Sequence, residues 1–175
     1  MDRAEIDAFW TDARIRAKLN RGGVYLGSTV AETVPPPVWA FGATPAQADE
    51  LLELVLMGVK TATTSARSEY AADGSDLPAP GGLGIVLDGA GRPRALICTT
   101  DVAVMPFAEV GADHARAEGE GDLSLACWRS AHRQFFTGHS ADGDGFDEQM
   151  LVVCERFKLL TARSGRVGAP ELVDH

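Results

Sequence analysis

One lysine stands among several hydroxyl residues in the stretch MGVKTATTSARSEY, directly after a segment with helical periodicity. If the ammonium of Lys60 is partly removed from water, the lysine can lose its proton and activate a nearby hydroxyl, that of Thr63 or Ser65, as a nucleophile. If Lys60 stays charged, it forms with these hydroxyls a donor-rich patch suited to a carbonyl, a nucleobase oxygen or a phosphate. Both hypotheses predict a small polar ligand here. The alternative without function is a solvated turn.

Three carboxylates alternate with glycines in the stretch EGEGD, at Glu118, Glu120 and Asp122. Clustered oxygen ligands suit a divalent cation, but the spacing is not that of a calcium-binding loop, so no metal and no other cofactor is expected. Asp122 is expected to begin the next helix, where the dipole favours a carboxylate. Glu118 is expected to be the partner that orients Lys60 or exchanges a proton with it.

Two groups of aromatic residues are candidate ligand contacts. Trp128 and His132 share one face of an expected helix, with core packing and a structural hydrogen bond as the alternatives. Trp39 and Phe41 are either core residues or a stacking surface for a base. Further candidates for ligand binding lie beside these residues or around Lys60: Gly42, Thr61, Thr64, Ser65, Arg67 and Arg129.

Helical periodicity predicts an N-terminal helix over residues 4–19, followed by a proline-rich connector. A second helix is expected over residues 44–57, because Thr44, Pro45 and Gln47 form a capping-box arrangement and Gly58 follows the last apolar turn. This helix fixes where the Lys60 segment begins.

The second half of the chain is expected to contain a small, mainly antiparallel sheet or barrel. GIVLD and RALICTTDVAVM predict a hairpin, and EQMLVVCERFKLL predicts a last strand. Between them, helices are expected over residues 112–118 and from about 122 to 136. Strands on both sides of inserted helices indicate an α+β fold.

Composition limits the partners. The formal net charge of -9, from 25 acidic and 16 basic residues, repels a polyanion at long range, so any nucleic-acid contact must be local. Cys98, Cys127 and Cys154 have no metal or redox spacing, which favours buried free thiols. No segment is long and apolar enough for a membrane span, and the first residues do not resemble a secretion signal. A cytoplasmic protein without membrane contact is expected.

The sequence resembles the ASCH-domain family, a relative of the PUA fold linked to RNA. The resemblance lies in VWAFGATPAQADELLELVLMGVKTATTS, in GIVLDGAGRPRALICTTDVAVMPFAEV and in HARAEGEGDLSLACWRSAHRQFF, which follow one another in the family order. It implies a PUA-like small β-barrel with flanking helices. It also implies an ASCH domain over residues 38–160, after an N-terminal helix and connector over 1–37 and before a flexible tail over 161–175.

The resemblance also implies a function. A small branch of the family removes the acetyl group from N4-acetylcytidine, and the residues matching its proposed catalytic set are Lys60, Thr63 and Glu118. A larger branch, more similar in length and in EGEGD and WRSAHRQFF, has been associated with RNA binding and metal-independent RNA cleavage. Where the small branch usually has an arginine, this chain has Ser65.

The chain is therefore expected to bind short or single-stranded RNA, or a modified nucleoside, in a PUA-like cleft. It is expected to hydrolyse this ligand without a metal, as a ribonuclease or an N4-acylcytidine amidohydrolase. The alternative is a non-catalytic RNA- or nucleotide-binding module, and DNA is not an expected partner.

Overall fold

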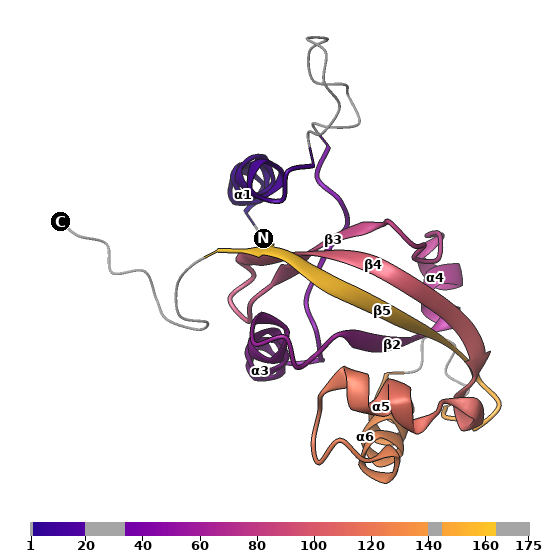
Figure 1. Cartoon of the computed structure of the whole chain (residues 1–175). Helices are drawn as coiled ribbons and strands as arrows, with labels where there is room; N and C mark the ends of the chain where they lie inside the picture. The colour runs from indigo at the N-terminus through magenta and orange to yellow at the C-terminus, as the bar shows by residue number, and fades with distance from the viewer. Residues whose placement is uncertain (1, 20–33, 140–144, 164–175) are drawn as a thin grey trace. The chain divides into compact units, whose positions relative to one another are not determined.

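The computed structural model describes residues 2–19, 34–139 and 145–163 (Figure 1). The chain forms two compact units: Met1–Met57 with Leu83–Cys98 and Leu159–His175, and Gly58–Gly82 with Thr99–Lys158. Its helices are α1 (Arg3–Arg16), α3 (Pro45–Leu56), α4 (Arg67–Asp73), α5 (Ala112–Glu118) and α6 (Leu125–Gly138), with a 3-10 turn at Phe107–Glu109. Its strands are β1 (Val38–Trp39), β2 (Ala62–Ala66), β3 (Leu83–Leu87), β4 (Pro93–Pro106) and β5 (Leu151–Ala162). The prediction of an α+β fold is confirmed.

The strands form one five-stranded sheet in the order β1-β3-β4-β5-β2. β3 and β4 pair antiparallel, with Leu83 opposite Cys98, which confirms the predicted hairpin. β1 pairs parallel with β3, so the sheet is mixed. The expected barrel is an open sheet in the structure, because the order begins with β1 and ends with β2, and β1 supplies only Val38–Trp39 to its edge.

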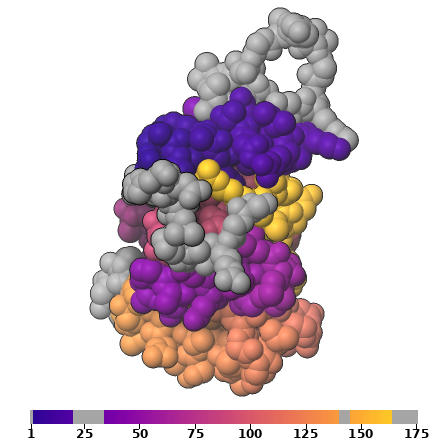
Figure 2. All heavy atoms as spheres, turned by 90° about the vertical axis from the view of Figure 1, so that its left-hand side faces the viewer, coloured from indigo at the N-terminus to yellow at the C-terminus, as the bar shows by residue number. Residues whose placement is uncertain are grey.

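In the first unit, α1 packs on β3 and β4. The Asp2 side chain accepts a hydrogen bond from the backbone N–H of Ala4 at 3.0 Å and begins the helix, which ends at Arg16, short of the predicted residue 19. Figure 2 shows α1 in indigo beside the yellow end of β5, where Leu160 contacts the same core. The buried members of this core are Ile6, Phe9, Trp10, Ala13, Ile85, Leu87 and Leu96.

Helix α3 is capped nearly as the sequence predicts. The side-chain oxygen of Thr44 accepts from the backbone N–H of Gln47 at 3.3 Å. The Gln47 side chain in turn accepts from the N–H of Ala43 at 2.9 Å, one residue further back than in a standard capping box. The helix ends at Leu56, and Gly58 follows with a left-handed φ of 74°.

In the second unit, α5 and α6 cover one face of β2 and β5. β2 pairs antiparallel with β5, from Ala62 opposite Arg156 to Ala66 opposite Val152. The two helices contact each other, and α5 contacts β2. The buried residues that join these elements are Ala66, Phe107, Val110, Ala115, Trp128, Phe136, Val152 and Cys154.

The structure corrects the expected elements around the carboxylates and the lysine. Helix α6 begins at Leu125, and its cap is Ser124, whose hydroxyl accepts from the N–H of Cys127 at 3.1 Å. Asp122 lies before the helix and accepts from the N–H of Ser124 at 2.9 Å, so the prediction that Asp122 begins the helix is wrong. The sequence did not predict β2 or α4. Residues 20–33 of the connector and 164–175 of the tail lie outside the described residues.

Gly119, directly after α5, sets the distance between this helix and the chain before β2. Its φ is 74°, and a Cβ there would lie 2.8 Å from the carbonyl oxygen of Val59. Gly58 has the same φ, but a Cβ there would meet nothing within 4 Å. The two glycines therefore share the backbone requirement and differ in the space around them.

We expect Gly119→Ala to destabilise the protein more than Gly58→Ala. Each substitution places an L-residue in a left-handed conformation, at a cost of about 1–2 kcal/mol. Gly119→Ala adds an overlap with the Val59 backbone, worth about 1–3 kcal/mol more. Urea unfolding of both variants measures the difference, and equal losses of unfolding free energy would show that the close approach at Gly119 does not constrain the fold.

Candidate functional site

Strand β2 divides the hydroxyl residues after Lys60 between two faces of the sheet. Successive side chains of a strand point to opposite faces, and in β2 Ala62, Thr64 and Ala66 are buried while Thr63 and Ser65 are half-buried. Ala66 belongs to the core beneath α5 and α6, so Thr64 faces these helices. Thr63 and Ser65 face the other side.

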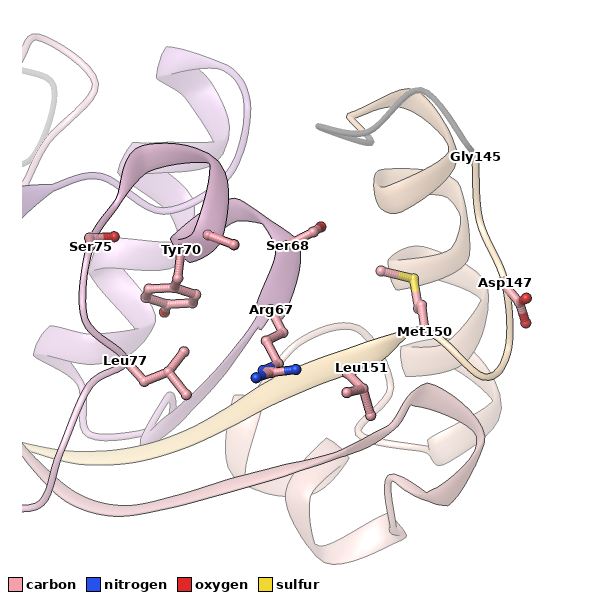
Figure 3. Close-up of a pocket in the computed structure, with 10 residues that line it drawn as sticks. Arg67, Ser68, Tyr70, Ser75, Leu77, Gly145, Asp147, Met150 and Leu151 are labelled. Carbon is pink, nitrogen blue, oxygen red and sulfur yellow. The ribbon is translucent and has the colours of Figure 1, made fainter.

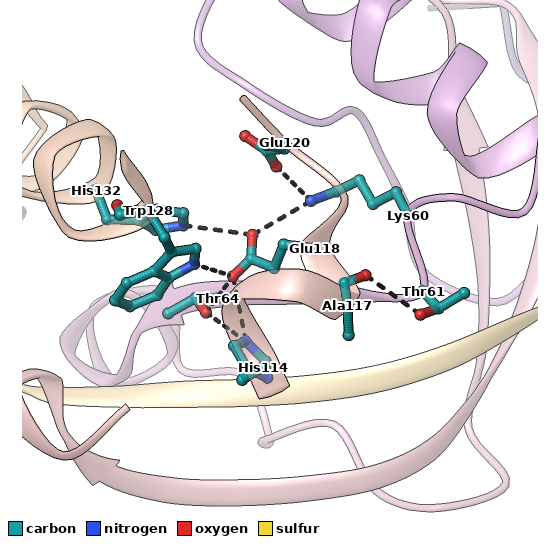
Figure 4. A network of polar contacts seen from close by, with 9 residues as sticks. All are labelled: Lys60, Thr61, Thr64, His114, Ala117, Glu118, Glu120, Trp128 and His132. Carbon is teal, nitrogen blue, oxygen red and sulfur yellow. Dashed lines mark hydrogen bonds and ion pairs between the residues drawn. The ribbon is translucent and has the colours of Figure 1, made fainter. Parts of the chain in front are cut away.

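The carboxylate of Glu118, at the end of α5, is the centre of a buried polar network (Figure 4). Its Oε1 accepts hydrogen bonds from Thr64 Oγ1 at 2.6 Å and from Trp128 Nε1 at 2.8 Å. His114 Nε2 lies 3.2 Å from the same oxygen and 2.8 Å from Thr64 Oγ1. Glu118 Oε2 lies 3.3 Å from Lys60 Nζ and 3.4 Å from His132 Nε2.

Lys60 joins this network to a second carboxylate. Its Nζ lies 2.5 Å from Glu120 Oε1 in addition to its contact with Glu118. The side chains of Lys60 and Glu118 are each 1% exposed, whereas that of Glu120 is 30% exposed. Glu120 is therefore the member of this ion-pair cluster that faces solvent.

The chain on either side of Lys60 is attached to the end of α5. The backbone N–H of Thr61 donates to the carbonyl oxygen of Ala117 at 2.8 Å, and its hydroxyl donates to the same oxygen at 3.2 Å. Val59 touches Gly119 closely, as described above. These contacts hold Lys60 beside Glu118 before any side-chain ion pair is counted.

Electrostatics keeps Glu118 ionised. Burial opposes the charge, but the Lys60 ammonium and the hydrogen bonds from His114 and His132 outweigh it, so the pKa of Glu118 lies well below its usual value of 4.5. A carboxylate held in this way is a weak base. Lys60 Nζ lies against an oxygen of each of two carboxylates, a geometry that suits a hydrogen-bond or proton donor better than a general base.

The network also indicates how the nitrogen atoms of the two histidines are hydrogen-bonded. The single hydroxyl proton of Thr64 goes to Glu118, so Nε2 of His114 must be the donor to both oxygens that it contacts. Nδ1 of His132 lies 3.1 Å from the carbonyl oxygen of Trp128, which only accepts. The other nitrogen of His132 faces the Glu118 carboxylate. Both nitrogens of His132 thus face acceptors, and its ring stacks on Trp128 with centroids 4.2 Å apart.

Residues 37–161 match the ASCH domain. The chain belongs to the ASCH-domain family. It is similar to a protein of Enterococcus faecalis V583, at 32% identity over 90% of this chain and 91% of that one, with a TM-score of 0.74. It is also similar to an ASCH domain from Lactobacillus crispatus JV V101, at 30% identity over 91% of this chain and 96% of that one, with a TM-score of 0.73. None of the curated proteins matches it.

In this ASCH domain, five of the residues predicted for the site lie in one network. They are Lys60, Thr64, Glu118, Trp128 and His132. Trp128 is also a core residue, since it is buried and stacks on Phe107 with centroids 5.1 Å apart. Whether these residues are catalytic or bind a ligand stays a prediction.

Thr61 lies next to this network, on the Ala117 carbonyl oxygen, and the other residues of the second unit predicted for the site lie elsewhere. The hydroxyl that contacts Glu118 belongs to Thr64. Thr63 is not among the described residues whose side chains contact Glu118. Ser65 contacts the hydroxyl of Tyr70 at 2.9 Å. Arg129 donates to the carbonyl oxygen of Ala108 at 2.9 Å, and Arg67 begins α4. Of the predicted catalytic set, Lys60 and Glu118 contact each other, whereas Thr63 lies on the other face of β2. That the three act together stays a prediction.

The residues predicted as a stacking surface belong to the first unit. Trp39 and Phe41 contact each other edge to face with centroids 4.6 Å apart, and Phe41 is buried. A Cβ at Gly42, whose φ is 70°, would lie 2.7 Å from Cβ of Gln47. Gly42 is thus required by the cap of α3, and a ligand role for these residues stays a prediction.

Two members of the network, His114 and Glu120, were not predicted as site residues from the sequence. His114 precedes Glu118 by one helical turn, so the predicted 112–118 helix already placed both on one face. Glu120 was considered only as a metal ligand. In the described ranges, no group of three or more His, Cys, Asp and Glu side chains could hold a metal ion, and the prediction of metal independence still rests on the sequence. The described helices include none that could cross a membrane.

Two substitutions in β2 test which face carries the network. We expect Thr64→Val to lower the unfolding free energy by about 1–3 kcal/mol, because a buried carboxylate loses a donor. Thr63→Val, on the other face of the same strand, is the matched control and should change it by less than about 0.5 kcal/mol. Urea unfolding compares the two, and a loss as large for Thr63→Val would contradict the assignment of faces.

The lowered pKa of Glu118 predicts a pH dependence of stability. Its ionised form stabilises the fold above the ordinary carboxyl pKa, and this contribution is lost as the pH falls through the lowered pKa of the folded state. At about pH 7, Glu118→Gln should cost on the order of 3 kcal/mol. The difference between wild type and Glu118→Gln should shrink toward about pH 3. Urea titrations across this range measure it, and a difference independent of pH would refute the electrostatic role.

Proposed function

We propose that this ASCH-domain protein binds a short RNA or an RNA end at the Lys60 network and cleaves it without a metal. The observation that supports this function is a buried ammonium, Lys60, which contacts the partly exposed carboxylate of Glu120. A modified nucleoside such as N4-acetylcytidine is the alternative ligand, and binding without cleavage is the alternative activity.

Glu120 is the member of the network that a ligand can replace with least disturbance. Its side chain is 30% exposed, whereas those of Lys60 and Glu118 are almost completely buried. Gly119 and Gly121 flank it with left-handed φ values of 74° and 58°, in a connection between α5 and α6. Moving Glu120 into water would remove one carboxylate from Lys60 Nζ and leave the contacts of Glu118 with Thr64, Trp128 and Lys60 in place.

The charges favour an anionic replacement. Lys60 contacts the Glu118 carboxylate, and Glu120 places a second negative oxygen against the same ammonium. A phosphate oxygen reproduces both the charge and the hydrogen bond of this carboxylate. The neutral carbonyl oxygen of an N-acetyl group reproduces the hydrogen bond alone, so the geometry supports RNA better than N4-acetylcytidine.

A charged Lys60 suits the chemistry of RNA cleavage. In that reaction the ribose 2′-oxygen forms a bond to phosphorus and gives its proton to water, while the bond from phosphorus to the leaving 5′-oxygen breaks. Lys60 would stabilise the extra negative charge on the phosphorus centre and supply the proton that the leaving oxygen takes, then regain one from water. Glu118 would hold Lys60 in position throughout.

The acidity of the whole chain restricts the length of the RNA. A net charge of -9 opposes tight binding of a long polyanion, whose affinity depends on many phosphate contacts. One phosphate at one buried lysine requires only a local contact. The proposed substrate is therefore an oligonucleotide of a few residues or the end of a longer strand.

The direct test incubates the purified protein with a short, end-labelled single-stranded RNA and, separately, with N4-acetylcytidine, each with and without a chelator. We expect RNA products ending in a 2′,3′-cyclic phosphate, in equal amounts with the chelator. Release of acetate from N4-acetylcytidine with intact RNA would support the alternative ligand. Turnover of neither, with saturable binding of RNA, would support the alternative of binding alone.

Replacing Glu120 separates a displaceable contact from a catalytic base. Glu120→Ala should lower KM for the RNA about fivefold or more while kcat stays within about threefold, because the phosphate no longer competes with a carboxylate for Lys60. Glu53→Ala, which removes an exposed carboxylate of α3, is the control for net charge. A fall in kcat of about 100-fold would instead identify Glu120 as a proton-transfer group.

A further inference from the structure

A second candidate binding site lies on the other face of β2, away from Glu118. A cavity of about 640 Å³ opens beside α4 and the start of β5 (Figure 3). Tyr70, which lines it, contacts Ser65, so the cavity lies on the Ser65 face of the strand. Its volume is within the range of small-molecule sites. The side chains that define it are Arg67, Tyr70, Leu77, Met150 and Leu151.

The cavity presents one accessible positive charge. The Arg67 guanidinium points into it (Figure 3). Arg67 takes part in none of the ion pairs of the described residues. The other charged lining residue is Asp147, whose side chain points away from Arg67. Asp147 accepts the backbone N–H of Gln149 at 2.7 Å. A planar guanidinium without a carboxylate partner is suited to a phosphate, which it can bind with two parallel hydrogen bonds.

The rest of the wall suits a flat ring. Tyr70 presents its ring to the cavity, and Met150 points into it (Figure 3). Leu77 and Leu151 are 37% and 40% exposed, although exposing a large apolar side chain to water is unfavourable. Aromatic and apolar side chains of this kind stack on nucleobases without selecting one base.

Tyr70 is fixed in place and uncharged. Its hydroxyl is hydrogen-bonded to Ser65 at 2.9 Å, which orients the ring. Burial raises the pKa of Tyr70 above its usual value of 10, against the Ser65 hydrogen bond and with the help of the charges of Glu155 and Glu69. The phenol therefore adds no negative charge that would repel an anion near Arg67.

An exposed arginine alone would indicate only a solvated side chain. Arg67 differs because it stands in a cavity large enough for a nucleotide, next to an oriented aromatic ring and two exposed leucines. We infer that this cavity binds a nucleotide, with its phosphate on the Arg67 guanidinium and its base against Tyr70 and Met150. The nucleotide can be free or part of an RNA strand. This site stands apart from the Lys60 network and does not depend on cleavage there.

The test follows uridine 5′-monophosphate binding by NMR, with the Met150 methyl group and the Tyr70 ring as local reporters. We expect both signals to shift in a saturable way with wild-type protein. Arg67→Met, which keeps most of the stem and removes the charge, should weaken this binding about tenfold or more. Arg116→Met, at an arginine whose side chain is 66% exposed in α5, is the matched control and should bind as wild type does.

Further ligands and variants identify the parts of the nucleotide that are bound. Tyr70→Phe keeps the ring and should retain binding, whereas Tyr70→Ala should weaken it about tenfold. Uridine and inorganic phosphate should each bind much more weakly than the nucleotide. Tighter binding of the dinucleotide UpU would identify an RNA strand as the ligand, and equal binding would identify a free nucleotide.

Several results would overturn the inference. They are unshifted Met150 and Tyr70 signals at millimolar nucleotide, equal affinity of Arg67→Met and wild type, and uridine or phosphate alone binding as tightly as the nucleotide. The proposed cleavage is measured separately through the products of RNA and the effect of Glu120→Ala. If either nucleotide binding or RNA cleavage is not observed, the other proposal can therefore still be tested.

Discussion

The second unit depends on the buried carboxylate of Glu118. Removing such a charge from water is costly, and the carboxylate stays ionised only because several donors and a cation surround it. These partners come from different elements: Thr64 from β2, Trp128 and His132 from α6, and Lys60 from the chain before β2. Satisfying one charge therefore fixes the relative positions of β2, α5 and α6, with the apolar core packed beside it.

The same arrangement makes stability and chemistry hard to separate at this site. Removing the Lys60 charge would leave two carboxylates facing each other around a vacated position, one of them buried, and such a change destabilises a fold whatever the lysine does in catalysis. Glu120 is different, because its side chain is partly exposed. Lys60 retains its ion pair with Glu118 when the Glu120 carboxylate is removed. The network thus has a buried part that maintains the structure and a solvent-facing part, Glu120, where we propose that a ligand exchanges. Function is tested most clearly at the exposed part.

Much of the fold could be predicted from sequence because several signals are local. The cap and glycine of α3 and the apolar alternation of the β3–β4 hairpin are read from short segments, and α5 was predicted with its observed bounds. β2 could not be predicted in this way, since its buried face carries two alanines and a threonine, and its burial comes from helices distant in sequence.

The missed strand explains why Thr63, and not Thr64, was expected beside Glu118. Without β2, nothing in the sequence distinguishes Thr63 from Thr64, and the family motif favoured Thr63. Once the segment is a strand, alternation places Thr64 beside Glu118 and turns Thr63 to the opposite face. The pairing of Lys60 with a carboxylate was accessible from residue types alone. Lys60 contacts both Glu118 and Glu120. This could not be predicted from residue types, because it depends on the turn that Gly119 and Gly121 make.

Strand β2 also shows how an acidic protein can offer two different local environments for an anion. On the Thr64 face, the cation is buried and already neutralised by carboxylates, so an anion must displace one of them to reach it. On the Ser65 face, the Arg67 guanidinium is open to its cavity and has no such competitor among the described residues. An anion therefore meets less resistance at Arg67 than at Lys60, while Lys60 offers the drier environment, in which electrostatic stabilisation is stronger. This difference is why we propose binding alone at Arg67 and cleavage at Lys60.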